Sequence, residues 1–191
     1  MKSNNDTRSQ ILDAAQDMLQ RQSISGVSFQ ELANRIGIKK GSMYYHFQSK
    51  DGLSIAILER ASSDMLAAFA RGAGKSPTQQ LAYFINIFRS FMGQAEKICP
   101  GGAFAGEWDK LNEPVQVQAH RLIKVQVQGL KKIIEAGLNT GEFSDHHQTS
   151  EALADWAVSN IQGALLTSRI TQNHLSFETS MDILMQYLTE Q

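Results

Sequence analysis

The chain has 191 residues, of which 42% are hydrophobic and 19% charged, and its net charge is −1. This length fits one large domain or two small ones, and the apolar fraction excludes a mainly disordered chain. The single cysteine, Cys99, excludes an intramolecular disulfide and a cysteine-rich zinc module. The near-neutral total argues against a nucleic-acid-binding protein, because such domains usually carry a strong basic excess.

The chain carries no sign of membrane insertion or export. No stretch approaches the ~18 apolar residues that a membrane span needs. Residues 1–7 lack the apolar core of a secretory signal, and the last residues match no lipidation signal. We therefore expect a cytoplasmic protein with no membrane partner.

Helical spacing of apolar residues dominates the first third of the chain. Residues 7–21 carry one apolar stripe at the spacing of an amphipathic helix, formed by Ile11, Leu12, Ala15, Met18 and Leu19. A short helix over 28–36 should bury Phe29, Leu32, Ala33 and Ile36 and begin with a capping box between Ser28 and Glu31. Gly37 suits the left-handed residue that ends such a helix.

Two more helices are predicted before the first clear break in the chain. One is short, at about 39–45, and Ser49 is the predicted N-cap of the next, which runs to about residue 71. Glycines at 72 and 74, followed by Pro77, mark the break, and Pro77 suits the first turn of another helix.

The remainder of the chain also reads as helical. The expected helices cover about 77–95, 103–112, 114–137, 148–171 and 176–189. Two Val-Gln-Val-Gln segments, at 115–118 and 125–128, alternate as strands do, but they continue the helical spacing without a turn residue between them. Gly137 and Gly141 bracket the expected end of that helix. The predicted fold class is therefore all-α.

Charge is distributed unevenly along the chain. Residues 1–50 hold seven Lys and Arg and four acidic residues, a net charge of +3, whereas the remainder has a net charge of −4. Within 35–50 there are four basic residues and His46, and no acid. Such asymmetry bears on nucleic-acid binding more directly than the total does.

The two short helices around Gly37 have the spacing of a helix-turn-helix, whose second helix enters the major groove of DNA. Met43 and Phe47, four residues apart, should form the inner face of that second helix. Gly41 permits close approach of the backbone, Ser42 and Tyr44 can donate to phosphates or base edges, and Lys40 can bond a guanine edge.

Residues 8–58 resemble the DNA-binding domain of the TetR family of bacterial transcriptional regulators. The resemblance is closest over 41–53, Gly-Ser-Met-Tyr-Tyr-His-Phe-Gln-Ser-Lys-Asp-Gly-Leu, and extends upstream over 27–38. It implies an N-terminal three-helix domain over 1–50 and a helical regulatory domain over 51–191. It also implies a homodimeric repressor whose C-terminal domain binds a small molecule.

The resemblance assigns DNA contacts to ten residues, which are Ser28, Gln30, Lys39, Lys40, Gly41, Ser42, Tyr44, Tyr45, His46 and Lys50. Ser28, Tyr45, His46 and Lys50 would contact phosphates, with the helix N-terminus assisting Lys50. Gln30 would project toward the groove, and the others would lie along it. A packing role remains open for His46, as does a core position for one of the two tyrosines.

An aromatic stripe in the second half suggests an effector pocket between helices. The proposed lining is Phe88, Phe91, Met92, Phe104, Trp108 and His120, with Glu107 as a further polar anchor. The same stripe suits an ordinary core. A small apolar or aromatic effector follows from this lining. A thiol sensor at Cys99 stays open against an inert cysteine.

The final two predicted helices, about 148–191, are expected to form the dimer interface. The expected seam on the first is Leu153, Ala157, Ile161, Ala164, Leu165 and Ser168, with Ser159 and Gly163 allowing close approach. The expected face on the second is Ile183, Leu184, Tyr187 and Leu188. A monomer that buries the same faces is the alternative. Two-fold symmetry would match two DNA half-sites ~34 Å apart.

The sequence thus predicts a ligand-responsive repressor that binds double-stranded DNA. The alternative is an all-α small-molecule-binding protein without productive DNA binding. Gly74-Lys75-Ser76 lacks the upstream glycine and strand of a phosphate-binding loop, and no hydrolase, metalloprotease or kinase motif occurs. We expect no enzyme activity, no cofactor and no metal site; His146 and His147 lack a third placed ligand.

Overall fold

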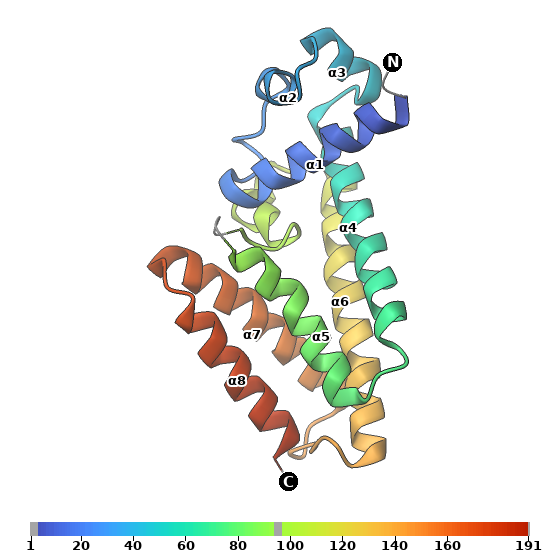
Figure 1. Cartoon of the computed structure of the whole chain (residues 1–191), viewed down its shortest axis with the longest axis vertical. Helices are drawn as coiled ribbons and strands as arrows, with labels where there is room; N and C mark the ends of the chain where they lie inside the picture. Colours follow the sequence, from blue (N-terminus) through green and yellow to red (C-terminus); the bar gives the residue numbers. More distant parts are fainter. Residues whose placement is uncertain (1–3, 94–96, 191) are drawn as a thin grey trace. The chain divides into compact units, whose positions relative to one another are not determined.

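The computed structural model describes residues 4–93 and 97–190, and all regular structure within these ranges is helical, which confirms the predicted class. In chain order the elements are α1 (Asn4–Gln22), α2 (Phe29–Ile36), α3 (Lys40–His46), α4 (Lys50–Gly72), α5 (Pro77–Arg89), η1 (Ser90–Met92), η2 (Gly102–Lys110), α6 (Glu113–Thr140), α7 (Ser150–Thr171) and α8 (Leu175–Thr189) (Figure 1).

The chain forms two compact units. The first comprises residues 1–61 and 100–122, and the second comprises 62–99 and 123–191, so the division falls within α4 and α6. The first unit is therefore larger than the predicted domain over 1–50. It includes η2 and the beginning of α6, which follow α5 in the sequence.

In the first unit, α1 packs on α2 and α2 packs on α3, as Figure 1 shows. The predicted signals for helix starts and ends are observed here. The Ser28 hydroxyl accepts a hydrogen bond from the Glu31 amide at 3.1 Å and so caps α2. Gly37 ends α2 with φ at 73°, a conformation that favours glycine. Ser49 caps α4 by accepting from the Gly52 amide at 3.0 Å.

The second unit is built around α5, α7 and α8, which pack against one another. Its core includes a row of aromatic rings along α5 and η1: Phe84 lies 5.1 Å from Phe88, and Phe88 lies 5.9 Å from Phe91 of η1. Phe69 of α4 stacks on Phe84 at 5.4 Å. The aromatic stripe is thus largely core, as its spacing allowed.

Several predicted helix ends are displaced in the structure. The helix expected over 77–95 ends at Arg89 and continues as the short 3-10 turn η1; residues 94–96 lie outside the described residues. The segment expected as a helix over 103–112 is the 3-10 helix η2, which is kinked at Glu107. Both differences occur near glycine-rich sequence, where helical propensity is low.

Helix α6 ends between Gly137 and Gly141, as predicted. The helix runs to Thr140, and Gly141, with φ at 74°, follows it. Gly137 accommodates the ring of Phe143: a Cβ at this position would lie 2.1 Å from Phe143 Cδ2. Both Val-Gln-Val-Gln segments lie within α6, so the expectation of helix there is confirmed.

The seam predicted for the dimer interface on α7 is wrong. All six of its residues are buried within this single chain: Leu153, Ala157, Ile161, Ala164, Leu165 and Ser168. On α8, Leu184 and Leu188 are likewise buried, whereas Ile183 and Tyr187 are exposed. The alternative, that the monomer itself buries these residues, is the one observed, because α7 turns that stripe toward α5 and α8.

None of the helices in the described ranges is long and apolar enough to span a membrane.

Candidate nucleic-acid interface

Helices α2 and α3 form a helix-turn-helix with a connection of three residues, 37–39. The amide of Ile38 donates to the Ala33 carbonyl at 2.9 Å, which completes the turn after Gly37. Met43 and Phe47 are buried beneath α3, as predicted, and they fix which side of the helix faces outward. The small, hydroxylic and basic residues at 40–42 consequently lie on the exposed side.

An open groove of about 320 Å³ lies on this exposed face. It gathers five of the ten predicted contact residues, which are Ser28, Gln30, Lys40, Tyr44 and Lys50. Phe29 and Ser49 also line it. The sequence prediction placed Phe29 in the core, yet this side chain is only half-buried, and its ring lies 5.2 Å from the ring of Tyr44. No sequence signal distinguished it from its buried neighbours on α2.

Both tyrosines of α3 are exposed, so neither takes the core position that the sequence left open. Tyr44 is 49% exposed and Tyr45 is 75% exposed. His46 is half-buried, and its ring meets that of Tyr45 edge-on at 5.3 Å. Both tyrosine side chains are therefore on the outer surface of α3.

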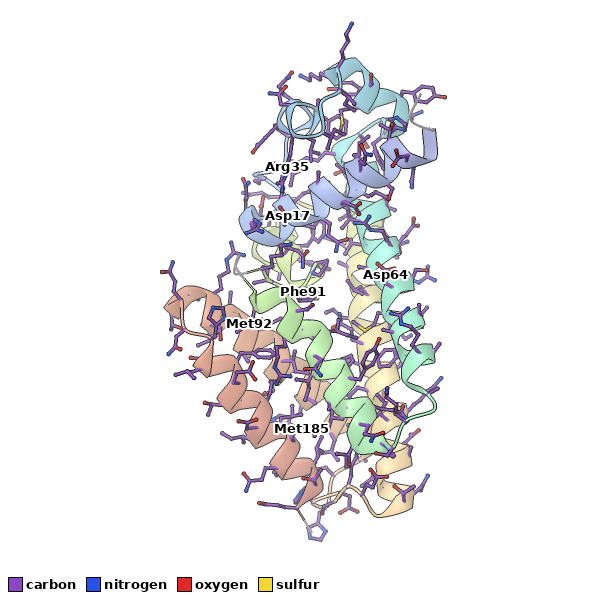
Figure 2. The ribbon with its side chains drawn as sticks, in the orientation of Figure 1. Asp17, Arg35, Asp64, Phe91, Met92 and Met185 are labelled. Carbon is purple, nitrogen blue, oxygen red and sulfur yellow. The ribbon has the colours of Figure 1, made fainter. Side chains whose placement is uncertain are left out.

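Two acidic side chains of α1, Asp13 and Asp17, form ion pairs within the first unit. Asp17 binds Arg35 at 2.6 Å and Arg21 at 3.2 Å, and Figure 2 shows Asp17 and Arg35 facing each other from α1 and α2. Asp13 binds Arg60 at 2.6 Å. Arg35, counted among the basic cluster in the sequence, is therefore a structural residue. The exposed cations Lys39 and Lys40 stand beside α3 itself.

The loop between α1 and α2 is held by the carboxylate of Glu107, which the sequence suggested as a polar anchor of the effector pocket. Glu107 of η2 accepts from the Ser23 hydroxyl at 2.6 Å, from the Ser25 amide at 3.1 Å and from the Ser25 hydroxyl. These donors lower the pKa of Glu107 to about 2. Lys50 donates to the Ser25 carbonyl at 3.4 Å. Glu107 is thus a positioning residue for the helix-turn-helix, and its suggested role as an effector anchor is not supported.

The six residues predicted to line an effector pocket divide between the two units. Phe88 of α5 and Phe91 and Met92 of η1 lie in the second unit, and Figure 2 labels Phe91 and Met92. The other three, Phe104, Trp108 and His120, lie in the first. Phe104 is fully buried, whereas Trp108 and His120 are exposed.

The second unit contains a small cavity next to Met92. Its volume is about 10 Å³, close to the size of one water, and Leu165, Ser168 and His174 are among its lining residues. Cys99 is fully buried, and its sulfur accepts a hydrogen bond from the Gln126 side chain at 3.5 Å. Its burial favours the inert cysteine over the thiol sensor.

Comparison with known proteins assigns the helix-turn-helix to a family. Residues 11–57 match the model of the bacterial regulatory proteins of the tetR family. The chain is 25% identical to the HTH-type transcriptional repressor DhaR of Mycobacterium sp. (strain GP1), over 95% of this chain and 91% of that protein. It is 35% identical to the HTH-type transcriptional regulator AcrR of Shigella flexneri over 60 residues, which are 31% of this chain and 28% of that protein.

Solved structures share the fold over the whole chain. A TetR-family transcriptional regulator from Agrobacterium tumefaciens superposes with a TM-score of 0.92 at 20% identity, covering 98% of this chain and all of the other. The reduced form of Escherichia coli NemR gives a TM-score of 0.82 at 20% identity, covering 97% and 100% of the two chains. Residues 11–57 thus form a DNA-binding domain of the TetR family of transcriptional regulators, which is not a family of enzymes, and the chain binds DNA through this helix-turn-helix.

Proposed function

We propose that this regulator is a homodimeric repressor that a small apolar or aromatic effector releases from its operator. The observation that carries the DNA-binding half of the proposal is the composition of the surface around α3. Exposed lysines and tyrosines gather there, while Asp13 and Asp17 of the same unit are neutralised by arginines. A concentrated positive surface of this kind attracts the phosphate backbone.

The proposed contacts divide by chemistry. Lys39, Lys40 and Lys50 supply charge to phosphates, and the Ser28 hydroxyl can donate its own hydrogen while accepting from the Glu31 amide. Gly41, Ser42 and Tyr44 lie along the groove, and Tyr45 and His46 contact phosphates. Gln30 donates to Asn34 at 3.0 Å, which leaves its amide oxygen available to a base edge.

The proposed dimer uses the faces of α7 and α8 that the monomer leaves exposed. Large apolar side chains on these faces are Leu166, Ile170, Ile183 and Tyr187. Ser159 and Gly163, also exposed, share the same side of α7 and permit close helix approach. Burying this set against a second copy removes apolar surface from water, which drives obligate association.

The proposed effector acts through the second unit. The rings of Phe84, Phe88 and Phe91 make part of the core of this unit apolar and aromatic, and such a core suits an apolar or aromatic molecule that enters it. Release requires that the effector bind the DNA-free state more tightly than the DNA-bound state. DhaR, over most of its length a relative of this chain, is itself described as a repressor.

The test is fluorescence anisotropy with labelled duplex DNA from upstream of the protein's own gene. We expect Tyr44→Ala and Lys50→Ala to weaken binding at least ten-fold without unfolding the chain, as circular dichroism checks. Lys132→Ala, an exposed lysine of the second unit, is the matched control and should bind as the parent does. Equal affinity of both helix-turn-helix variants and the parent would refute these assignments. Negligible, salt-insensitive DNA affinity of the parent would favour the small-molecule-binding alternative.

A further inference from the structure

Arg8 near the start of α1 differs from the other arginines of the first 61 residues in what it contacts. Arg21, Arg35 and Arg60 each bind an aspartate. The guanidinium of Arg8 instead lies 4.8 Å from the centre of the Phe47 ring, and among the described residues no carboxylate pairs with it. Its positive charge is therefore not neutralised by any carboxylate of the described residues.

Contact with a ring orients the guanidinium without using its hydrogen-bond donors. A cation over an aromatic face is attracted by the ring quadrupole, and all five N–H groups stay available. The planar fork of an arginine held in this way fits the oxygens of a phosphate in a bidentate arrangement. Arg8 is itself exposed, while Phe47 beneath it is buried.

The position of Phe47 places the guanidinium of Arg8 at the C-terminal end of α3, the helix proposed to enter the major groove. Phe47 directly follows α3, and Arg8 from the first turns of α1 lies over its ring. Lys39 and Lys40 stand at the opposite end of α3. A seven-residue helix is about 10 Å long, so it is no longer than the major groove is wide, roughly 12 Å. Cations at both of its ends consequently come close to the phosphates that border the groove.

We propose that Arg8 is an additional DNA-backbone contact, a sequence-independent phosphate clamp that Phe47 holds in position. The proposal rests on the DNA-binding mode described above and adds a contact from α1, outside the helix-turn-helix. It assigns no base recognition to Arg8.

The test measures binding to a duplex of arbitrary sequence as a function of salt concentration. Each phosphate contact contributes ~0.9 to the slope of log K against log [salt]. We expect Arg8→Gln to lower the slope by ~0.9 per protomer and to weaken binding roughly five-fold per protomer at 0.15 M salt. The loss should be the same for upstream DNA and for the arbitrary duplex. Arg8→Lys should keep most of the slope, because a lysine supplies the same charge.

Arg21→Gln is the matched control, since it removes the same charge from the same helix but from an arginine that binds Asp17. It should leave the slope unchanged. An unchanged slope for Arg8→Gln, or an equal decrease for Arg21→Gln, would overturn the proposal. Thermal unfolding of each variant separates loss of the Phe47 contact from loss of a phosphate contact. If the parent binds neither duplex, the proposed function fails, and the Arg8 assignment with it.

Discussion

Glu107 shows how one carboxylate can organise a loop distant in sequence. Its three hydrogen bonds reach Ser23 and Ser25, which lie 84 and 82 residues away. Ser23 has a positive φ of 69°, a conformation that is unfavourable for serine in isolation. The carboxylate therefore offsets the strain of a turn that leads directly into α2.

At the residue scale we predict that this carboxylate makes stability depend on pH. Its pKa is lowered to about 2, so its stabilising effect is complete above the ordinary value near 4.5 and is lost as pH falls toward 2. Glu107→Gln should lower the free energy of unfolding at pH 7 by about 1 kcal/mol, or about 2–4 °C in Tm. The difference between parent and variant should shrink at low pH.

The measurement is thermal unfolding of parent and variant between pH 7 and pH 2. Asp109→Asn removes another carboxylate from η2 and serves as the control. A difference in Tm between parent and Glu107→Gln that stays constant down to pH 2 would contradict the assignment.

At the scale of elements, short-range signals decide where most helices begin. Ser28, Ser49 and Thr149 each cap the helix that follows. For α5 the sequence predicted only that Pro77 lies in the first turn, and the structure adds a capping box. Ser76 accepts from the Gln79 amide at 3.4 Å, and Gln79 accepts in return from the Ser76 amide at 3.3 Å.

We predict that Ser76→Ala destabilises the chain by about 1 kcal/mol, because the Gln79 amide at the start of α5 loses its hydrogen-bond acceptor. The corresponding decrease in Tm is about 2–4 °C. Ser76→Thr keeps the hydroxyl and should lose much less. Calorimetry of the three proteins checks the prediction, and equal stability of Ser76→Ala and the parent would show that this capping box contributes little.

At the scale of the whole molecule, α7 and α8 keep large apolar side chains exposed to solvent in the single chain. Ile170 is 73% exposed and Leu175 is 70% exposed, although each is a large apolar residue. Such side chains grouped on one surface indicate an interface. The proposed dimer is therefore the assembly in which this surface is covered.

We predict that Ile170→Glu converts a dimer into a monomer, because each copy would bring an unpaired carboxylate into an apolar interface. Sedimentation equilibrium at micromolar concentration measures the mass directly. Leu66→Glu, at an exposed apolar position of α4, is the matched control and should leave the mass unchanged. A dimer that persists in Ile170→Glu would show that this face is not the interface.

The sequence by itself determined the helix-turn-helix, because its signals are local. Caps at Ser28 and Ser49, the left-handed Gly37 and the four-residue spacing of Met43 and Phe47 act within one or two turns of helix. Steric and hydrogen-bonding interactions over one or two turns depend only on residues that are neighbours in the sequence, so they can be predicted from it. The candidate DNA contacts Lys40, Gly41, Ser42 and Tyr44 followed from the chemistry of these residues, whereas Tyr45 and His46 were assigned by the family resemblance.

Only the tertiary structure decided which groups meet across long separations. Helix α7 carries apolar residues on two sides, and packing against α5 and α8 determined that Ile161 points inward and Ile170 outward. The partners of Asp17 and Glu107 likewise depend on how helices are placed, which no periodicity specifies. The sequence shows that both faces of α7 carry apolar residues. Which face is buried depends on how the helix packs against its neighbours, and only the tertiary structure shows that.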